Sequence, residues 1–231
     1  SEEILDSFDI ERINPITLLF QSGYLTITDV QTRIGRLIFE LSVPNQEVRL
    51  ALNDQFISGY TGIEEQRFHL QEGLYDCLTR GDLDGLVAMI KRVFAGIPWR
   101  NFTGNDLPDS EGYYASVLYA FLASLNAEII PEDLTNHGQV DLTVRIAGYT
   151  YVMEFKLERG TAASKVTADE AETAADGASS AETFNPALAQ IQARGYSEKY
   201  RGAPGRGLFE VGLVFGSTAR NLIQADWRRL V

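Results

Sequence analysis

The clearest alternation of apolar and polar positions lies within residues 140–157. Leu142, Val144 and Ile146 alternate with polar residues, which predicts a strand that turns one side towards a core. A second apolar run begins directly afterwards, and the Ala147-Gly148 pair between the two runs suits a tight turn. The pattern therefore predicts a β-hairpin in this part of the chain.

Helical spacing and strand-like alternation predict further elements on both sides of this hairpin. The elements expected before it are strands over residues 24–28 and 37–43, helices over 44–59, 68–78, 83–94 and 111–125, and a short strand over 127–130. The elements expected after it are a helix that begins at Pro186 and a strand over residues 208–215. Asp82, Ser110 and Asn185 stand immediately before predicted helices, where their side chains can cap free N–H groups.

The order of these elements favours two regions within the 231 residues. Residues 1–100 form an α+β region in which a strand pair precedes helices, an arrangement compatible with a winged-helix-like module. Residues 101–231 form an α/β domain. Its order of helix, strand, hairpin, helix and strand predicts a mixed β-sheet flanked by helices.

A segment near residues 160–183 interrupts the second region. It is rich in Ala, Ser, Thr, Asp and Glu and has almost no large apolar residues. Between Lys165 and Glu182 one lysine stands against five acidic residues, which gives a net charge of −4. This composition predicts a flexible acidic insertion, and an alanine-rich helix is the alternative.

Composition and charge exclude several classes of protein. A hydrophobic fraction of 45% indicates a globular protein, and no apolar run is long enough to cross a membrane. Cys77 is the only cysteine, which excludes an internal disulfide and points to a reducing, cytoplasmic location. One cysteine and two histidines cannot build a structural zinc site of the usual kind. A net charge of −12 argues against a protein that coats nucleic acid broadly.

The predicted hairpin carries three charged residues that the fold would bring together. Glu154 and Lys156 are two positions apart on one strand and therefore share a face. Pairing of the two strands brings Asp141 to the same neighbourhood. Charges on a buried strand are costly unless they are paired or bind a metal, so these residues mark a candidate site. A surface hairpin with a Glu154–Lys156 ion pair is the plainer interpretation.

These residues resemble the motifs of the PD-(D/E)XK nuclease superfamily. Val140-Asp141 corresponds to the first motif and Glu154-Phe155-Lys156 to the second, although the proline of the first motif is absent. The resemblance implies an α-β-β-β-α-β core and a metal-dependent enzyme that hydrolyses phosphodiester bonds of nucleic acid.

A longer resemblance concerns a bacterial and archaeal family that joins an AAA-type ATPase-like domain to a C-terminal PD-(D/E)XK domain. It runs from about Asn14 to Trp227 and includes the segments LLFQSGYLTI, VPNQEVR and RGDLDGLVAMIKRVFAGIP. No phosphate-binding loop of the G-x-x-x-x-G-K-[ST] type occurs in this sequence. The resemblance therefore implies the C-terminal part of a longer protein with an ATPase-like domain upstream.

The chemistry of phosphodiester hydrolysis assigns roles to the motif residues. Mg²⁺, or Mn²⁺ in its place, prefers carboxylate oxygens and water, so Asp141 and Glu154 would hold the ion. The backbone carbonyl of Phe155 is a further metal ligand in this assignment. Lys156 would orient the attacking water or neutralise the negative charge that develops at phosphorus.

The resemblance adds two residues from neighbouring helices. Glu111, in an E-x-x-Y pattern, would approach the metal from the helix before the first core strand and act as a further metal-site residue. Gln190, in an A-L-x-Q-I pattern, would touch metal-bound water or phosphate. Without the resemblance, each residue has a simpler explanation. Glu111 can serve only to stabilise the dipole of its helix, and Gln190 can be a glutamine exposed to solvent.

Nucleic acid is the expected partner, with DNA favoured over RNA. Seven basic and three acidic residues lie between Arg194 and Arg229, so this segment carries +4 and offers a local surface for phosphates. Two other classes stay open: a non-catalytic domain of the same fold that binds nucleic acid or another partner, and a docking module for the ATPase-like half.

Overall fold

A computed structural model describes residues 14–160 and 184–230 of the chain. The described residues divide into two compact units between Phe56 and Ile57. The sequence analysis expected the N-terminal region to extend to residue 100. In the structure, helices α4 (Arg67–Arg80) and α5 (Leu83–Ala95) share a hydrophobic core with the sheet of the second unit. The acidic insertion predicted near residues 160–183 lies almost entirely outside the described residues.

The first unit contains α2 (Pro15–Gln21), the strands β1 (Thr26–Arg33) and β2 (Arg36–Ser42), and the beginning of α3 (Gln46–Thr61). The two strands pair antiparallel, which confirms the predicted strand pair. Ile34 and Gly35 join them with φ angles of 51° and 73°, and two successive positive φ angles are what a type I′ hairpin turn requires.

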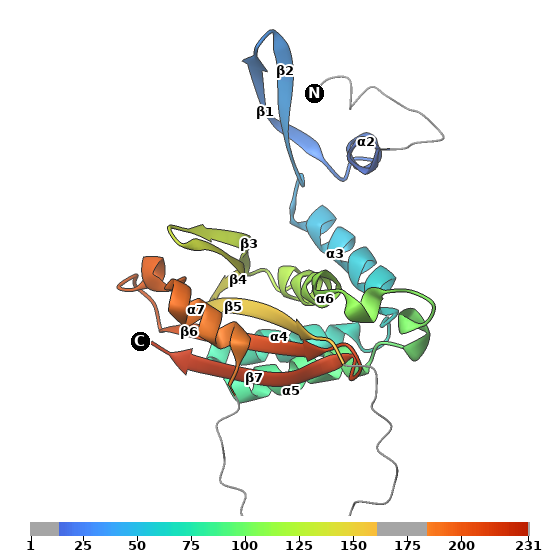
Figure 1. Ribbon diagram of the computed structural model, residues 1–231. Helices are drawn as coiled ribbons and strands as arrows, with labels where there is room; N and C mark the ends of the chain where they lie inside the picture. The colour runs from blue at the N-terminus through green and yellow to red at the C-terminus, as the bar shows by residue number, and fades with distance from the viewer. Residues whose placement is uncertain (1–13, 161–183, 231) are drawn as a thin grey trace, which may run out of the picture. The chain divides into compact units, whose positions relative to one another are not determined.

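A five-stranded mixed sheet forms the centre of the second unit (Figure 1). Its strands, in spatial order, are β3 (Glu128–Thr135), β4 (Gly138–Ile146), β5 (Tyr149–Glu158), β6 (Gly207–Gly216) and β7 (Asn221–Arg229). Only β5 and β6 run parallel to each other. The predicted fold class and the predicted β4–β5 hairpin are confirmed. The sequence analysis missed β7 and expected β3 to end at residue 130.

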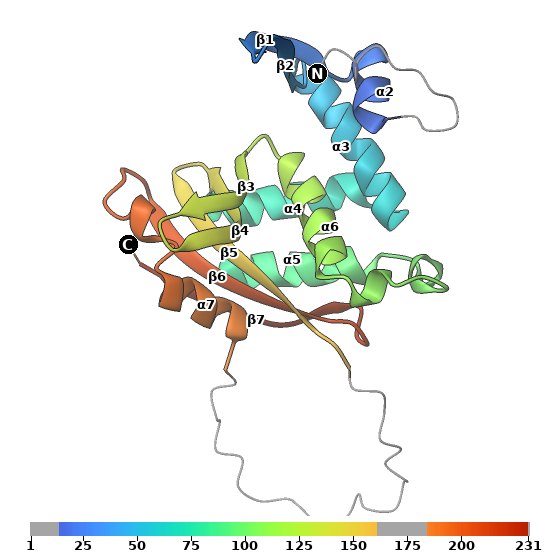
Figure 2. The same cartoon turned by 45° about the horizontal axis from the view of Figure 1, so that its top comes forward.

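Helices cover both faces of this sheet (Figures 1 and 2). On one face, α4, α5 and α6 (Glu111–Ala123) enclose the main hydrophobic core. On the other face, α7 (Pro186–Arg194) covers a smaller apolar cluster through Ile191. The predicted caps are confirmed: Asp82, Ser110 and Asn185 accept hydrogen bonds from the first turns of α5, α6 and α7. None of the helices that the structure describes is long and apolar enough to cross a membrane.

Tyr151 links β5 to α4 across the main core. Its ring is fully buried and stacks on Phe209 of β6, with 5.3 Å between the ring centroids. Its hydroxyl donates to the Leu78 carbonyl at 2.6 Å, near the C-terminal end of α4 where carbonyls lack helical partners. This hydrogen bond therefore fixes the strand that carries the candidate site against a helix of the core.

We expect Tyr151→Phe to lower the free energy of unfolding by about 1–3 kcal/mol, because the Leu78 carbonyl loses its donor inside the core. Chemical denaturation measures this change. Tyr119→Phe is the matched control, because Tyr119 is 39% exposed and its stability should stay within about 0.5 kcal/mol of the wild type. Equal stabilities of wild type and Tyr151→Phe would contradict the assigned role of the hydroxyl.

Candidate active site

The site begins where β4 parts from β5. The register between the two strands ends at the pair Leu142–Met153. Beyond that pair, residues 154–158 of β5 still pair with β6 on the other side. We call the side of residues 154–158 that faces away from β6 the open edge of β5. Backbone groups on this edge need partners other than a strand.

Carboxylates provide those partners. The Phe155 N–H donates to Oδ2 of Asp141 at 2.7 Å, and the Leu157 N–H donates to Oε2 of Glu111 at 3.0 Å. The two carboxylates therefore occupy successive positions along the open edge of β5. The N–H and C=O of a strand residue point to the same side, so the Phe155 carbonyl also faces the side of Asp141.

Glu154 lies beside this edge and is only 1% exposed. Its Oε1 accepts from Nζ of Lys156 at 3.0 Å and also from Nε2 of Gln190, while its Oε2 lies 3.4 Å from the backbone nitrogen of Asp141. The structure thus places Asp141, Glu154, Lys156 and Gln190 in one continuous network. Glu111, from α6, contacts β5 at Leu157, two residues beyond the Phe155 contact of Asp141.

Gln190 reaches Glu154 because α7 packs very closely on β6. A Cβ atom at Gly212 would lie 2.3 Å from the Leu188 nitrogen, so any larger residue would push the helix away. Asn185, the cap of α7, donates to the Gly212 carbonyl at 3.1 Å and holds the start of the helix on the strand. The glycine and the cap together set the height of Gln190 above the sheet.

The pKa values of the site residues are shifted because negatively charged groups lie close together and are partly removed from water. Burial, followed by the charge of Asp141, raises the pKa of Glu154 above its usual value despite the Lys156 ammonium. Burial also raises the pKa of Asp141, although the Phe155 N–H opposes this, and the charge of Glu111 adds to the rise. Burial lowers the pKa of Lys156, but Glu154 and the other carboxylates outweigh it and raise that pKa overall. The site therefore favours an additional cation or proton.

The donor set fits a hard divalent cation. Two carboxylates with raised pKa values and one backbone carbonyl supply the oxygen ligands that Mg²⁺ prefers, and Mg²⁺ keeps several waters as its remaining ligands. Within residues 14–160 and 184–230, no group of three or more His, Cys, Asp or Glu side chains has the geometry of a metal site. Glu111 is thus a neighbour of the candidate ligands rather than a third member of a closed cluster.

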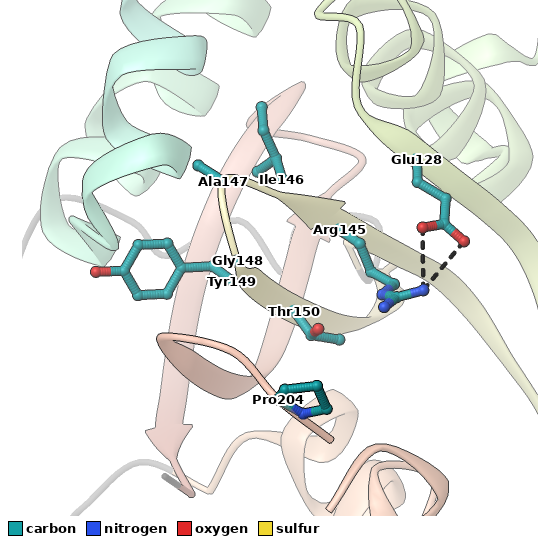
Figure 3. A pocket seen from close by; sticks show the side chains of 8 residues that line it. All are labelled: Glu128, Arg145, Ile146, Ala147, Gly148, Tyr149, Thr150 and Pro204. Carbon is teal, nitrogen blue, oxygen red and sulfur yellow. Dashed lines mark hydrogen bonds and ion pairs between the residues drawn. The ribbon is translucent and has the colours of Figure 1, made fainter. Parts of the chain in front are cut away.

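Two pockets of the second unit lie away from these residues. One, of about 220 Å³, is formed at the β4–β5 turn, and Figure 3 shows Arg145 directed towards Glu128 there, with Tyr149 on the other side of the turn. About six residues of strand separate this turn from Asp141 and Glu154, which corresponds to about 20 Å. The other pocket lies between the β3–β4 turn and the segment after α7. Neither includes a predicted site residue.

One buried charge on β3, opposite β4, was not predicted from the sequence. Asp133 on β3 is 5% exposed and accepts from the hydroxyls of Thr143 at 2.8 Å and Tyr200 at 2.6 Å, and from the Lys199 ammonium. Burial raises the pKa of Asp133, but these hydrogen bonds outweigh it and lower the pKa overall. No local pattern marks this network, because Lys199 and Tyr200 lie 66 and 67 positions away along the chain.

The raised pKa values of the two carboxylates give a prediction about stability and pH. A carboxyl whose folded pKa lies above its unfolded pKa contributes stability at low pH and loses it as pH rises through the folded pKa. We therefore expect metal-free Asp141→Asn to unfold at a higher temperature than wild type at pH 7, because it removes the repulsion with Glu154. The difference should vanish at about pH 3, where both carboxyls are protonated.

Thermal unfolding in a chelator, across pH 3 to 8, measures this. Asp29→Asn, which changes a carboxylate of the β1–β2 hairpin, is the control for the change in net charge alone. A metal-free Asp141→Asn variant that is less stable than wild type at every pH would show that the carboxylates do not repel each other.

Comparisons with known proteins agree with this geometry. A family model of the PD-(D/E)XK nuclease superfamily matches residues 109–225, about half of the chain. The chain is also 32% identical over 223 residues to a protein of Azotobacter chroococcum mcd 1 described as "Uncharacterized protein in vnfD 5'region". This match covers 96% of the chain but only 39% of that relative. No solved structure matches significantly. The chain belongs to the PD-(D/E)XK nuclease superfamily.

Proposed function

We propose that this chain is a metal-dependent nuclease that hydrolyses phosphodiester bonds with Mg²⁺ or Mn²⁺. One observation carries the proposal: Asp141 and Glu154, two desolvated carboxylates with raised pKa values, adjoin Lys156 at the open edge of β5. A cluster of two carboxylates that one ammonium compensates only in part is unfavourable for the fold alone and suits a divalent cation.

Each residue has a role that follows from its position. Asp141, Glu154 and the Phe155 carbonyl would hold the ion. A bound divalent cation supplies a water of lowered pKa and offsets charge on the phosphate. Lys156 is 30% exposed at its side chain and hydrogen-bonded to Glu154, so its ammonium is fixed at the boundary between the buried carboxylate and solvent. There it can stabilise the charge that develops on the phosphate oxygens.

Glu111 and Gln190 would act around this centre. Gln190 donates to Glu154 and thereby fixes the direction in which that carboxylate presents its second oxygen. Glu111 accepts from the Leu157 N–H and is exposed, so its carboxylate can reach water at the site. Both are positioning roles in this proposal, secondary to those of Asp141 and Glu154.

The substrate we propose is DNA in preference to RNA. Four basic residues lie from the last residue of α7 to the start of β6, which supports phosphate binding. They are Arg194, Lys199, Arg201 and Arg206. We further propose that the chain acts within a longer protein with an ATPase-like domain upstream. It spans about two fifths of the relative from Azotobacter, which supports a longer architecture.

A non-catalytic binding domain on the same fold is the second candidate. One observation favours it: Asp141 and Glu111 already accept backbone hydrogen bonds, and the described residues form no closed group of three metal-binding side chains. In that case the carboxylates serve only as hydrogen-bond acceptors for the open edge of β5 and bind no metal. Metal binding and cleavage by the purified protein distinguish the two candidates.

We expect Mg²⁺ or Mn²⁺ to bind the wild type and raise its unfolding temperature, because the ion binds only the assembled carboxylates. Asp141→Asn should lose both the binding and the stabilisation, together with cleavage. Calorimetric titration and thermal unfolding measure the first two quantities, and a gel assay with labelled DNA measures the third. If Asp141→Asn binds the metal as tightly as the wild type does, Asp141 is not a ligand and its proposed role is wrong.

Lys156→Ala should lower the rate of cleavage without weakening metal binding. The lysine is not a ligand, so the variant should bind the ion within a few-fold of wild type, whereas cleavage should fall by about 10²–10³-fold. Lys91→Ala on α5 is the matched control for loss of one lysine, and it should cleave as the wild type does. Normal cleavage by Lys156→Ala would contradict the proposed role.

A further inference from the structure

Two arginines lie just beyond the carboxylates, at the end of the open edge of β5. Arg159 follows the last residue of β5, and its guanidinium donates to the Asp109 carbonyl at 3.5 Å. Asp109 stands two residues before Glu111, whose carboxylate accepts from the Leu157 N–H. Arg159 is therefore attached to the same segment as Glu111 and lies next to the site.

Arg220 reaches this place from the turn between β6 and β7. The turn is bound to the chain on both sides of Arg159, because the Ser217 N–H donates to the Glu158 carbonyl at 3.0 Å and the Gly160 N–H donates to the Ser217 hydroxyl at 3.3 Å. Figures 1 and 2 both show the end of β5 beside the β6–β7 turn. The Arg220 guanidinium lies 5.5 Å from the centre of the Phe102 ring, which fixes the direction of its side chain.

The backbone at Arg220 is strained. Its φ is 53°, in the left-handed region that glycine, asparagine or aspartate adopt more readily than arginine. Glycine would adopt this φ without strain, so an arginine here is less favourable for the fold than a glycine would be. The packing on Phe102 alone needs only an apolar surface, so it does not account for a guanidinium at this position.

Both guanidinium groups also lack a carboxylate partner among the described residues. Arg80, Arg145 and Arg228 form ion pairs with Asp76, Glu128 and Glu210, respectively. The described residues place no carboxylate within ion-pair distance of Arg159 or Arg220, although Glu158 adjoins Arg159 in sequence and Arg159 contacts the Asp109 carbonyl. In a protein of net charge −12, two such guanidinium groups, both directed towards the segment of residues 102–109, make a local site for an anion.

We propose that Arg159 and Arg220 together bind one backbone phosphate of the substrate strand, next to the phosphate that is cleaved. This inference rests on the proposed function, because it takes the carboxylates as the place of cleavage. The planar guanidinium group binds phosphate oxygens with two parallel hydrogen bonds, and Arg159 uses only one of its donors on Asp109. The strand then leaves the carboxylates towards the β6–β7 turn, and the two arginines offset the repulsion between the acidic protein and the phosphates.

Binding of a fluorescein-labelled DNA oligonucleotide tests this site over a series of salt concentrations. Ca²⁺ replaces Mg²⁺ in this measurement, and a gel checks that the oligonucleotide stays intact. We expect Arg159→Gln and Arg220→Gln each to weaken binding about tenfold and to make the slope of log K against log salt shallower by about 0.7–0.9. Arg220→Lys should keep the wild-type slope, because it keeps the charge.

Arg145→Gln is the matched control, since it removes the same charge at the opposite end of the β4–β5 hairpin and should leave the slope unchanged. Arg220→Gly removes the guanidinium and also relieves the positive φ. It should weaken binding as Arg220→Gln does, while its unfolding temperature stays within about 3 °C of wild type because relief of strain offsets the lost packing and the added chain entropy.

A parallel cleavage assay separates this inference from the proposed function. If Arg159→Gln and Arg220→Gln weaken binding as expected but the wild type cleaves nothing, the phosphate site stands and the nuclease assignment falls. If the wild type cleaves while Arg159→Gln and Arg220→Gln keep the wild-type affinity and slope, the nuclease stands and the phosphate site is wrong. Absence of salt-dependent binding by the wild type also overturns the phosphate site.

Discussion

The parting of β4 from β5 after the pair Leu142–Met153 is the constraint on which the site depends. A strand that loses its neighbour exposes N–H groups that need acceptors. Here Phe155 and Leu157 find them in the carboxylates of Asp141 and Glu111 rather than in another strand. The gap in the sheet therefore gathers negative charge at one edge, and this charge is fixed by the same hydrogen bonds that complete the fold.

The surrounding structure holds this edge rigid. Tyr151 fixes β5 to α4 on one face, and the close approach at Gly212 brings α7 and Gln190 to Glu154 on the other face. Glu154 is thereby enclosed and loses water, which raises the free energy of its charged form. Lys156 offsets only part of that rise, as the raised pKa of Glu154 shows. A rigid, desolvated carboxylate pair is a better site for a cation than a flexible one, because no ordering is needed when the ion arrives.

Local patterns predicted much of this arrangement, and long-range register explains what they missed. The β4–β5 hairpin, the caps at Asp82, Ser110 and Asn185, and the grouping of Asp141 with Glu154 and Lys156 depend on residues close in sequence or on one strand pair. The backbone partners of Asp141 and Glu111 depend on where strand pairing stops, which no spacing encodes. The Asp133 network depends on segments far away along the chain. The strand β7 pairs with β6, its neighbour in sequence, and was missed because polar and charged residues interrupt its apolar pattern.

Charge balance explains why the arginines and the carboxylates belong to one surface. The proposed nucleic-acid substrate is polyanionic and would meet a chain of net charge −12, so its approach would be unfavourable over most of the protein. Attraction must be local, and it can arise at the carboxylates only after a cation has reversed their charge. Arg159 and Arg220 lie just beyond those carboxylates and form no ion pair with the described residues, so they attract a phosphate before and after the cation binds. In the proposed site the carboxylates would hold the cation, the arginines would hold one phosphate, and the neighbouring phosphodiester bond would lie between them at Lys156.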